Sequence, residues 1–414
     1  MKTIYRAFDT RWSLPALGLA ALLGGLALPA GANQYVTSDR TTANGNPLNG
    51  SYIGQTVVVG ASLIANGIVT RVANVKADVV APALFRYSDQ TGGGLAAYSN
   101  SVVRVLGGNF DQISGTGFGG GVELQDTSTG LISGGTLRFL SLSGTAPGAA
   151  GALATVSGGL IQNGVAGVAS AVNGTLNVNG GTLRSQGGQA GIAGGAGSVI
   201  NVSGGLVQSA LGSAIYIGPD SALTLAGGTV SGAAGGVAQW GVRLESVNVM
   251  ARLLGGTVNG GVRADAGPNQ VALAAMLGGS LQVNGGVFAY GNAALNVQGG
   301  SYTRFAGADA SFFAMGSNTV NFFGTDLALS GPTAGSVFEL NNYLGNFYTF
   351  TAGTFSDGQS AVGLRLFDAV SVAGNQLGGG FTLNPAAVPE PATWLMLMLT
   401  LPAVAAAARR RARI

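Results

Sequence analysis

The chain has no cysteine and no histidine among its 414 residues. The lack of cysteine excludes disulfides and thiol nucleophiles, and the lack of histidine excludes catalytic triads that use a histidine base. Metal sites built from cysteine or histidine ligands are excluded as well. We therefore expect no metal ion and no other cofactor.

Charged residues are also scarce: they make up 8% of the chain, against about 25% in an average globular protein. Disordered chains combine high charge with few apolar residues, whereas 47% of this chain is hydrophobic. The 73 glycines follow no three-residue period, which excludes a collagen helix. This composition favours a β-rich, turn-dense architecture.

The positive charge belongs to the two ends of the chain. Between Asn33 and Val388 there are 12 basic and 14 acidic side chains, although the whole sequence has a pI of about 9.3. A nucleic-acid partner requires a basic face on the folded body, so we expect none.

The first 32 residues have the layout of a secretory signal peptide. Basic residues come first, an uncharged apolar run covers Ser13 to Leu28, and Ala30 and Ala32 form an A-x-A cleavage pattern before Asn33. We expect the secretion translocon to export the chain and cleavage to occur before Asn33. The alternative is an uncleaved N-terminal anchor.

Near the other end, residues 392–408 form an uncharged run of 17 residues, about 25 Å long as a helix. This is the short limit for spanning a hydrocarbon core of about 30 Å. The cluster that follows consists of Arg409, Arg410, Arg411 and Arg413. The positive-inside rule keeps such a cluster cytoplasmic, which places the body outside the inner membrane.

The residues before this run are Val388, Pro389, Glu390 and Pro391. Together with the apolar run and the arginines, they resemble the PEP-CTERM sorting signal of Gram-negative bacteria. The resemblance covers residues 388–414 and implies that an exosortase recognises Pro-Glu-Pro and removes the tail. It also implies passage through the inner membrane to the cell surface or beyond, and an association with exopolysaccharide and biofilm. The alternative is an ordinary tail anchor.

Glycine pairs recur along the body at intervals of 21 to 28 residues, with a mean of 24. Repeats of this length indicate a solenoid. The first glycines of the nine pairs are Gly107, Gly134, Gly158, Gly180, Gly204, Gly227, Gly255, Gly278 and Gly299.

Alignment on the first glycine gives two apolar columns and one polar column. Two places before it stand Val105, Ile132, Val156, Val178, Val202, Leu225, Leu253, Met276 and Val297. Three places after it stand Phe110, Leu137, Ile161, Leu183, Val207, Val230, Val258, Leu281 and Tyr302. The next place holds Asp111, Arg138, Gln162, Arg184, Gln208, Ser231, Asn259, Gln282 and Thr303.

This two-residue alternation predicts strands with the apolar columns facing inward. The fold class is therefore all-β: a parallel β-solenoid with coils of about 24 residues, for which right-handed winding is expected. We expect an N-terminal cap and first coils at 33–100, the glycine-pair solenoid at 101–308, and aromatic-rich closing coils or a cap at 309–387. The repeats resemble β-helical, adhesin-like regions of bacterial surface proteins.

Few residues suggest chemistry. GTGFGG at 115–120 matches a dinucleotide-binding pattern, but no helix is expected after it, so we dismiss it. Asp111, Glu123 and Asp126 fall within one coil and Arg138 begins the next, as in a β-helical polysaccharide lyase or hydrolase. Scattered solubilising charges explain them equally well.

Hydroxyl side chains recur two places after the first glycine, at Thr136, Thr182, Thr229, Thr257, Ser280 and Ser301, with Leu160 and Leu206 interrupting. Such a ladder could bind ice or sugar, although threonine also simply favours strands. We predict a non-enzymatic, exported structural or adhesive protein associated with exopolysaccharide. The alternatives are a polysaccharide lyase or hydrolase, and an ice- or sugar-binding solenoid.

Overall fold

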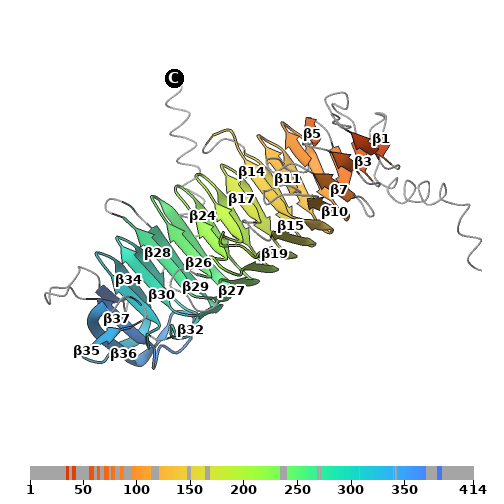
Figure 1. The fold of residues 1–414 in the computed structure, drawn as a ribbon. Helices are drawn as coiled ribbons and strands as arrows, with labels where there is room; N and C mark the ends of the chain where they lie inside the picture. Colours follow the sequence, from red (N-terminus) through yellow and green to blue (C-terminus); the bar gives the residue numbers. More distant parts are fainter. Residues whose placement is uncertain are drawn as a thin grey trace, which may run out of the picture. The chain divides into compact units, whose positions relative to one another are not determined.

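The computed structural model describes seven short strands between residues 34 and 87, and then residues 95–384 except 113–120, 147–150, 164–167, 234–239, 268–269, 271, 307, 339, 341–342 and 370–379. All of the regular structure in this described part is β-strand (Figure 1). The chain divides into two compact units, residues 1–245 and 246–414.

Unit 1 is a parallel β-solenoid whose strands lie in three stacks, and each coil from β3 onward contributes one strand to each stack. The first stack consists of β1 (Gln34–Val36), β3 (Thr56–Val59), β6 (Lys76–Val79), β9 (Val102–Val105), β12 (Thr129–Ile132), β15 (Leu153–Val156), β18 (Thr175–Val178), β21 (Val199–Val202) and β24 (Ala222–Leu225). From β12 to β24, register partners on neighbouring strands lie 22 to 24 residues apart. The predicted coil length is therefore confirmed.

The other two stacks follow the same order. The second stack consists of β2 (Arg40–Thr42), β4 (Leu63–Ala65), β7 (Leu84–Tyr87), β10 (Asn109–Gln112), β13 (Thr136–Leu137), β16 (Leu160–Asn163), β19 (Thr182–Ser185), β22 (Leu206–Ser209) and β25 (Thr229–Ser231). The third consists of β5 (Thr70–Ala73), β8 (Leu95–Tyr98), β11 (Gly121–Gln125), β14 (Phe139–Ser143), β17 (Ala169–Val172), β20 (Ile192–Gly194), β23 (Ile215–Ile217) and β26 (Val242–Glu245).

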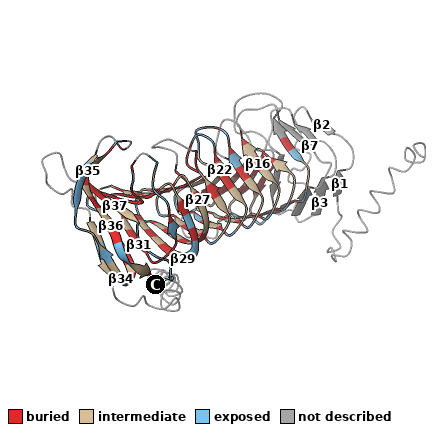
Figure 2. Cartoon of the chain, turned by 90° about the horizontal axis from the view of Figure 1, so that it is seen from below, coloured by how far each residue is buried: buried red, intermediate tan, exposed pale blue. Residues whose placement is uncertain are grey.

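The core lies where the apolar columns predict it. All eighteen members of the two columns are buried, and none is more than 7% exposed. None of the described side chains of the polar column, Arg138 to Thr303, is buried. Figure 2 shows the resulting alternation of buried and less buried residues along the strands. The inward and outward faces are therefore confirmed.

The two glycines of each pair have different physical roles. The second has a positive φ in eight of the nine pairs, for example +76° at Gly181, a conformation that only glycine adopts readily. The first is a site of close approach: a Cβ on Gly180 would lie 2.5 Å from the carbonyl oxygen of Ser157 in the preceding coil. The pair thus makes the turn and lets neighbouring turns stack.

Unit 2, taken alone, is also built from stacked parallel strands, and several of them are longer than those of unit 1. The strands that hold its first two positions are β27 (Val249–Asn259), β29 (Ala272–Asn284), β31 (Ala294–Val297), β32 (Ser301–Tyr302), β34 (Thr319–Leu329) and β38 (Gly380–Asn384). The third position is held by β28 (Val262–Ala266), β30 (Val287–Gly291), β33 (Phe312–Met315) and β37 (Arg365–Ala369).

One column of the sequence alignment is wrong in unit 2. The pairing of β27 with β29 shifts by two residues after Leu253, so that Val258 pairs with Val283 and not with Leu281. Val283 in turn pairs with Tyr302. Leu281 is nevertheless fully buried, and the extra residues form a bulge at the Gly278–Gly279 pair, where Gly279 is exposed. Gly279 is the one second glycine without a positive φ.

The parallel class does not hold throughout unit 2. β34 and β38 are register neighbours, with Thr319 opposite Gly380, and the chain between them contains β35 (Thr333–Val337) and β36 (Tyr343–Phe355). β36 pairs antiparallel with β34, β35 and β37. Aromatic rings pack along this region; the ring centroids of Phe347 on β36 and Phe367 on β37 lie 4.9 Å apart. The strict 24-residue repeat ends here: Gly299 begins the last pair of the series, and the next consecutive glycines in the sequence are Gly378 to Gly380.

Candidate functional site

The predicted carboxylate cluster is divided between two stacks of unit 1. Asp111 lies on β10 in the second stack, whereas Glu123 lies on β11 in the third, in register with Ala96 and Ser141. The side chain of Asp111 lies outside the described part. Because adjacent stacks present different faces of a coil, the fold does not support Asp111 and Glu123 as an acid–base pair.

Asp126 has a local structural position. It occupies the turn after β11 with φ of 56°, and its Oδ2 accepts a long hydrogen bond of 3.4 Å from the backbone N–H of Ser99 in the preceding coil. Aspartate is among the residues that tolerate this conformation. Asp126 therefore contributes to the stacking of two turns.

In the structure, the predicted hydroxyl column alternates between threonine and leucine along the second stack. Register partners along the second stack run Thr136, Leu160, Thr182, Leu206 and Thr229. In unit 2, Thr257 pairs with Gln282 and not with the predicted Ser280, because of the register shift. The outer surface therefore offers hydroxyl and leucine side chains in turn.

Amide ladders were not predicted from the sequence. In each of three pairs the Nδ2 of one asparagine donates to the Oδ1 of another on a neighbouring coil: Asn201 to Asn177 and Asn284 to Asn259, both at 2.9 Å, and Asn321 to Asn296 at 3.0 Å. A signal was present, since Asn177, Asn201 and Asn296 each stand three places before a first glycine. An amide in such a ladder retains further hydrogen-bonding capacity for an external partner.

An open groove of about 340 Å³ crosses the outer face of the second stack in unit 1. Its lining includes Asn109, Thr136, Arg138, Leu160, Gln162 and Gln186. The groove follows the stacking direction, since these residues come from successive coils. The polar column continues past it through Arg184 and Gln208, which are register partners.

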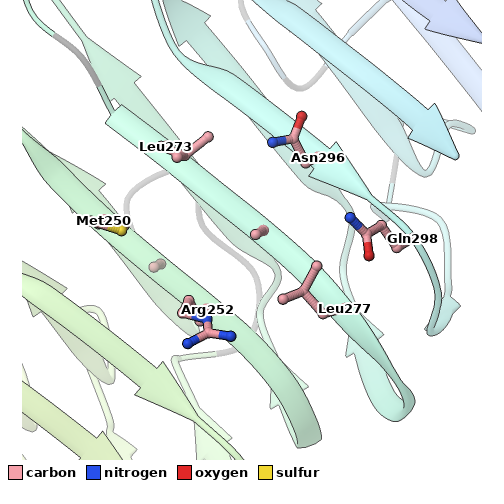
Figure 3. Close-up of a pocket in the computed structure, with 8 residues that line it drawn as sticks. Met250, Arg252, Leu273, Leu277, Asn296 and Gln298 are labelled. Carbon is pink, nitrogen blue, oxygen red and sulfur yellow. The ribbon is translucent and has the colours of Figure 1, made fainter. Parts of the chain in front are cut away.

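A smaller and more enclosed pocket of about 70 Å³ lies on the outer face of unit 2 (Figure 3). β27 contributes Met250 and Arg252, and β29 contributes Leu273, Ala275 and Leu277. Asn296 on β31 and Gln298 just after it complete the wall. Its walls are mostly aliphatic, with an arginine on one side and two amides on the other.

Two ion pairs lie beside tyrosines on third-stack strands, one in each unit. In unit 1, Arg243 pairs with Glu245 at 2.7 Å. In unit 2, Arg263 pairs with Asp265 at 2.5 Å and its guanidinium lies 4.3 Å from the ring centre of Tyr290. Burial raises the pKa of Tyr290 to about 12, although the arginine opposes this shift. The arrangement suits a neutral tyrosine that packs against an ion pair.

The sorting and cleavage predictions fall outside the described part of the chain. This applies to Ala30, Ala32 and Asn33, to Val388 through Pro391, and to the Arg409–Arg413 cluster. Within the residues that the structure describes, no helix is long and apolar enough to cross a membrane. In the same residues, no group of three or more carboxylates is placed to hold a metal ion.

Comparison of the chain with protein-family models, with curated proteins and with solved structures gives no match.

Proposed function

We propose that the protein is an exported, non-enzymatic β-solenoid that binds exopolysaccharide and organises it at the cell surface. The observation that carries this proposal is the groove of about 340 Å³ on the second stack, together with the polar column that runs along it. An extended polymer can lie along such a column, because each coil repeats a similar set of polar groups.

The spacing of the coils supports an extended carbohydrate. Strands in a sheet lie about 4.8 Å apart, which is close to the length of one pyranose in an extended chain. Successive coils along the column present Arg138, Gln162, Arg184 and Gln208. Guanidinium and amide groups donate hydrogen bonds to sugar hydroxyls and to carboxylates. Repetition lets weak contacts add up over several coils.

Export and sorting complete the proposal. The signal-peptide pattern supports translocation, and the Pro389-Glu390-Pro391 pattern before an apolar run supports processing by an exosortase after insertion in the inner membrane. We expect the mature protein to begin at Asn33 and to lack the arginine cluster. Intact-mass analysis of protein extracted from the cell surface measures both ends, and two unprocessed termini would contradict the sorting proposal.

Binding is tested by pull-down of the purified protein with exopolysaccharide from the producing bacterium. Four substitutions along the groove column, Arg138→Ala, Gln162→Ala, Arg184→Ala and Gln208→Ala, are expected to weaken retention about tenfold or more when combined. Glu123→Ala, on the third stack, serves as the control and should retain the polymer. The triple variant Asp111→Ala, Glu123→Ala, Asp126→Ala removes carboxylates and no hydrogen-bond donor, so it should retain the polymer too. Full retention by the groove variant would refute the assignment of the site.

Catalysis is tested in the same incubation by size-exclusion chromatography of the sugar. An enzyme depends on a few acid–base groups, and removal of one lowers turnover by orders of magnitude. We expect no shortening of the chains. Shortened chains with the unmodified protein, and intact chains with the triple carboxylate variant, would establish an enzyme instead.

A further inference from the structure

The pocket in unit 2 owes its shape to one small residue between two long ones. Arg252, Ala275 and Asn296 are register partners on β27, β29 and β31, so the methyl group of Ala275 lies between a guanidinium and an amide. Leu273 and Leu277 stand two places before and after Ala275 on the same strand. They project from the same face as Ala275, which makes a walled hollow above it.

The size of the hollow limits what can enter it. Its volume of about 70 Å³ is roughly half that of an engineered protein cavity of about 150 Å³ that holds benzene. Pockets that enclose a whole small ligand measure about 300 Å³ or more. A sugar ring therefore stays outside, and only a substituent of two or three non-hydrogen atoms fits.

The rim determines the chemistry of that substituent. The Oδ1 of Asn296 already accepts from the Nδ2 of Asn321 at 3.0 Å, which leaves the amide nitrogen of Asn296 as its donor toward other groups. Figure 3 shows this nitrogen on the side of Asn296 that is nearer β29. Arg252 presents a guanidinium, which only donates, from the opposite side. The pocket thus combines an aliphatic floor with hydrogen-bond donors.

We propose that this pocket binds the acetyl substituents of a polysaccharide. The methyl group would pack on Ala275 between Leu273 and Leu277, and the carbonyl oxygen would accept a hydrogen bond from Arg252 or Asn296. A hydroxyl group would make no apolar contact with the aliphatic walls, and a plain alkyl group would offer no acceptor to the amide nitrogen of Asn296. The inference rests on the proposed exopolysaccharide binding and names the substituent that is recognised.

Two sources of acetyl group are distinguished by the choice of probe. Chitin oligosaccharides carry amide-linked acetyl groups, and glucosamine oligosaccharides are the matched sugars without them. Xylan with acetyl esters, before and after mild alkaline treatment, tests the ester. The full chain purified from producing cells should bind at least one acetylated probe about tenfold more tightly than its deacetylated partner, the discrimination expected for one small apolar group.

Variants place this preference in the pocket. Ala275→Leu fills the hollow, so the variant should bind acetylated and deacetylated probes with about equal affinity. Ala222→Leu, on an outer position of unit 1, should leave the preference for the acetylated probe unchanged. Arg252→Gln removes the guanidinium and should weaken the preference, whereas Arg243→Gln, on a third-stack strand away from the groove column, serves as its control. Circular dichroism of each variant verifies folding, and Arg252→Gln keeps the test decisive if Ala275→Leu does not fold.

The outcomes separate this inference from the proposed function. Binding of host exopolysaccharide with equal affinity for acetylated and deacetylated probes would overturn the acetyl pocket alone. A preference that persists in both Ala275→Leu and Arg252→Gln would do the same. No retention of any polysaccharide would overturn the proposed function, and this inference with it.

Discussion

Leu183→Asp tests the inward face of the coils, and Leu153→Asp provides a matched control. Leu183 on β19 is fully buried, and its register partners Ile161 and Val207 are fully buried too. Leu153 on β15 faces outward and is 37% exposed. Both variants make the same chemical change on a strand, so differences in strand propensity largely cancel between them.

The expected magnitudes follow from this burial. Removal of a buried leucine side chain costs about 2–5 kcal/mol, and a carboxylate without a partner in the core adds to that cost. We therefore expect Leu183→Asp to lower the free energy of unfolding by at least about 3 kcal/mol. Leu153→Asp should cost about 1 kcal/mol or less, as is usual for surface positions.

Urea denaturation followed by far-ultraviolet circular dichroism measures the difference between the two variants. Hydrogen exchange shows where Leu183→Asp destabilises the fold. The backbone amides of β16, β19 and β22 should lose protection first in this variant, because each coil of a solenoid is stabilised mainly by its neighbours. Equal losses of stability in the two variants would refute the assigned faces. So would a larger loss for Leu153→Asp.

Three further predictions concern turns, the antiparallel region and pH. Gly180→Ala should destabilise the protein by about 1–3 kcal/mol, because its Cβ would lie 2.5 Å from a carbonyl oxygen, whereas Gly188→Ala, with no atom within 4 Å, should be neutral or slightly stabilising in the same denaturation assay. Asp357 accepts from the backbone N–H of Gly300 at 2.7 Å, so Asp357→Ala should speed hydrogen exchange at Gly300; unchanged exchange would contradict this role. Because the pKa of Tyr290 is raised to about 12, its phenol should lose its proton at higher pH than ordinary tyrosines, which titrate near pH 10. Difference absorbance of tyrosinate between the unmodified protein and Tyr290→Phe measures this pKa. The contribution of neutral Tyr290 to folding stability is complete below pH 10 and falls as the pH rises toward 12.

The repeat predicts much of the fold because it constrains each coil separately. A column such as Val156, Val178 and Val202 is informative since every coil must bury the same position against its neighbours. The sequence also predicts that the glycine pairs turn. It does not separate their roles, because the close approach at Gly180 depends on the carbonyl of a preceding coil. That contact exists only after stacking.

The alignment on glycine pairs predicts the wrong strand register where one coil contains extra residues. Alignment on Gly278 places Leu281 opposite Val258, but the structure pairs Val258 with Val283 across a two-residue shift. Both Leu281 and Val283 are buried and apolar, so the column looks unbroken in either alignment. The antiparallel pairing of β36 is missed for a related reason. The residues that pair with β36 lie at varying separations along the chain, so a search for a fixed repeat length cannot find them.

The pocket of unit 2 shows why a binding site in such a fold escapes a search for motifs. None of its residues is unusual alone, and Ala275 has no polar group to draw attention to it. The hollow exists because the register places Ala275 between Arg252 and Asn296, residues 23 and 21 positions away along the chain. Outward positions tolerate side chains of different size better than the core columns do, since they do not fill the space inside the coil. Variation in side-chain size at one outward row is therefore the simplest way for a solenoid to acquire a specific pocket without disturbing its fold.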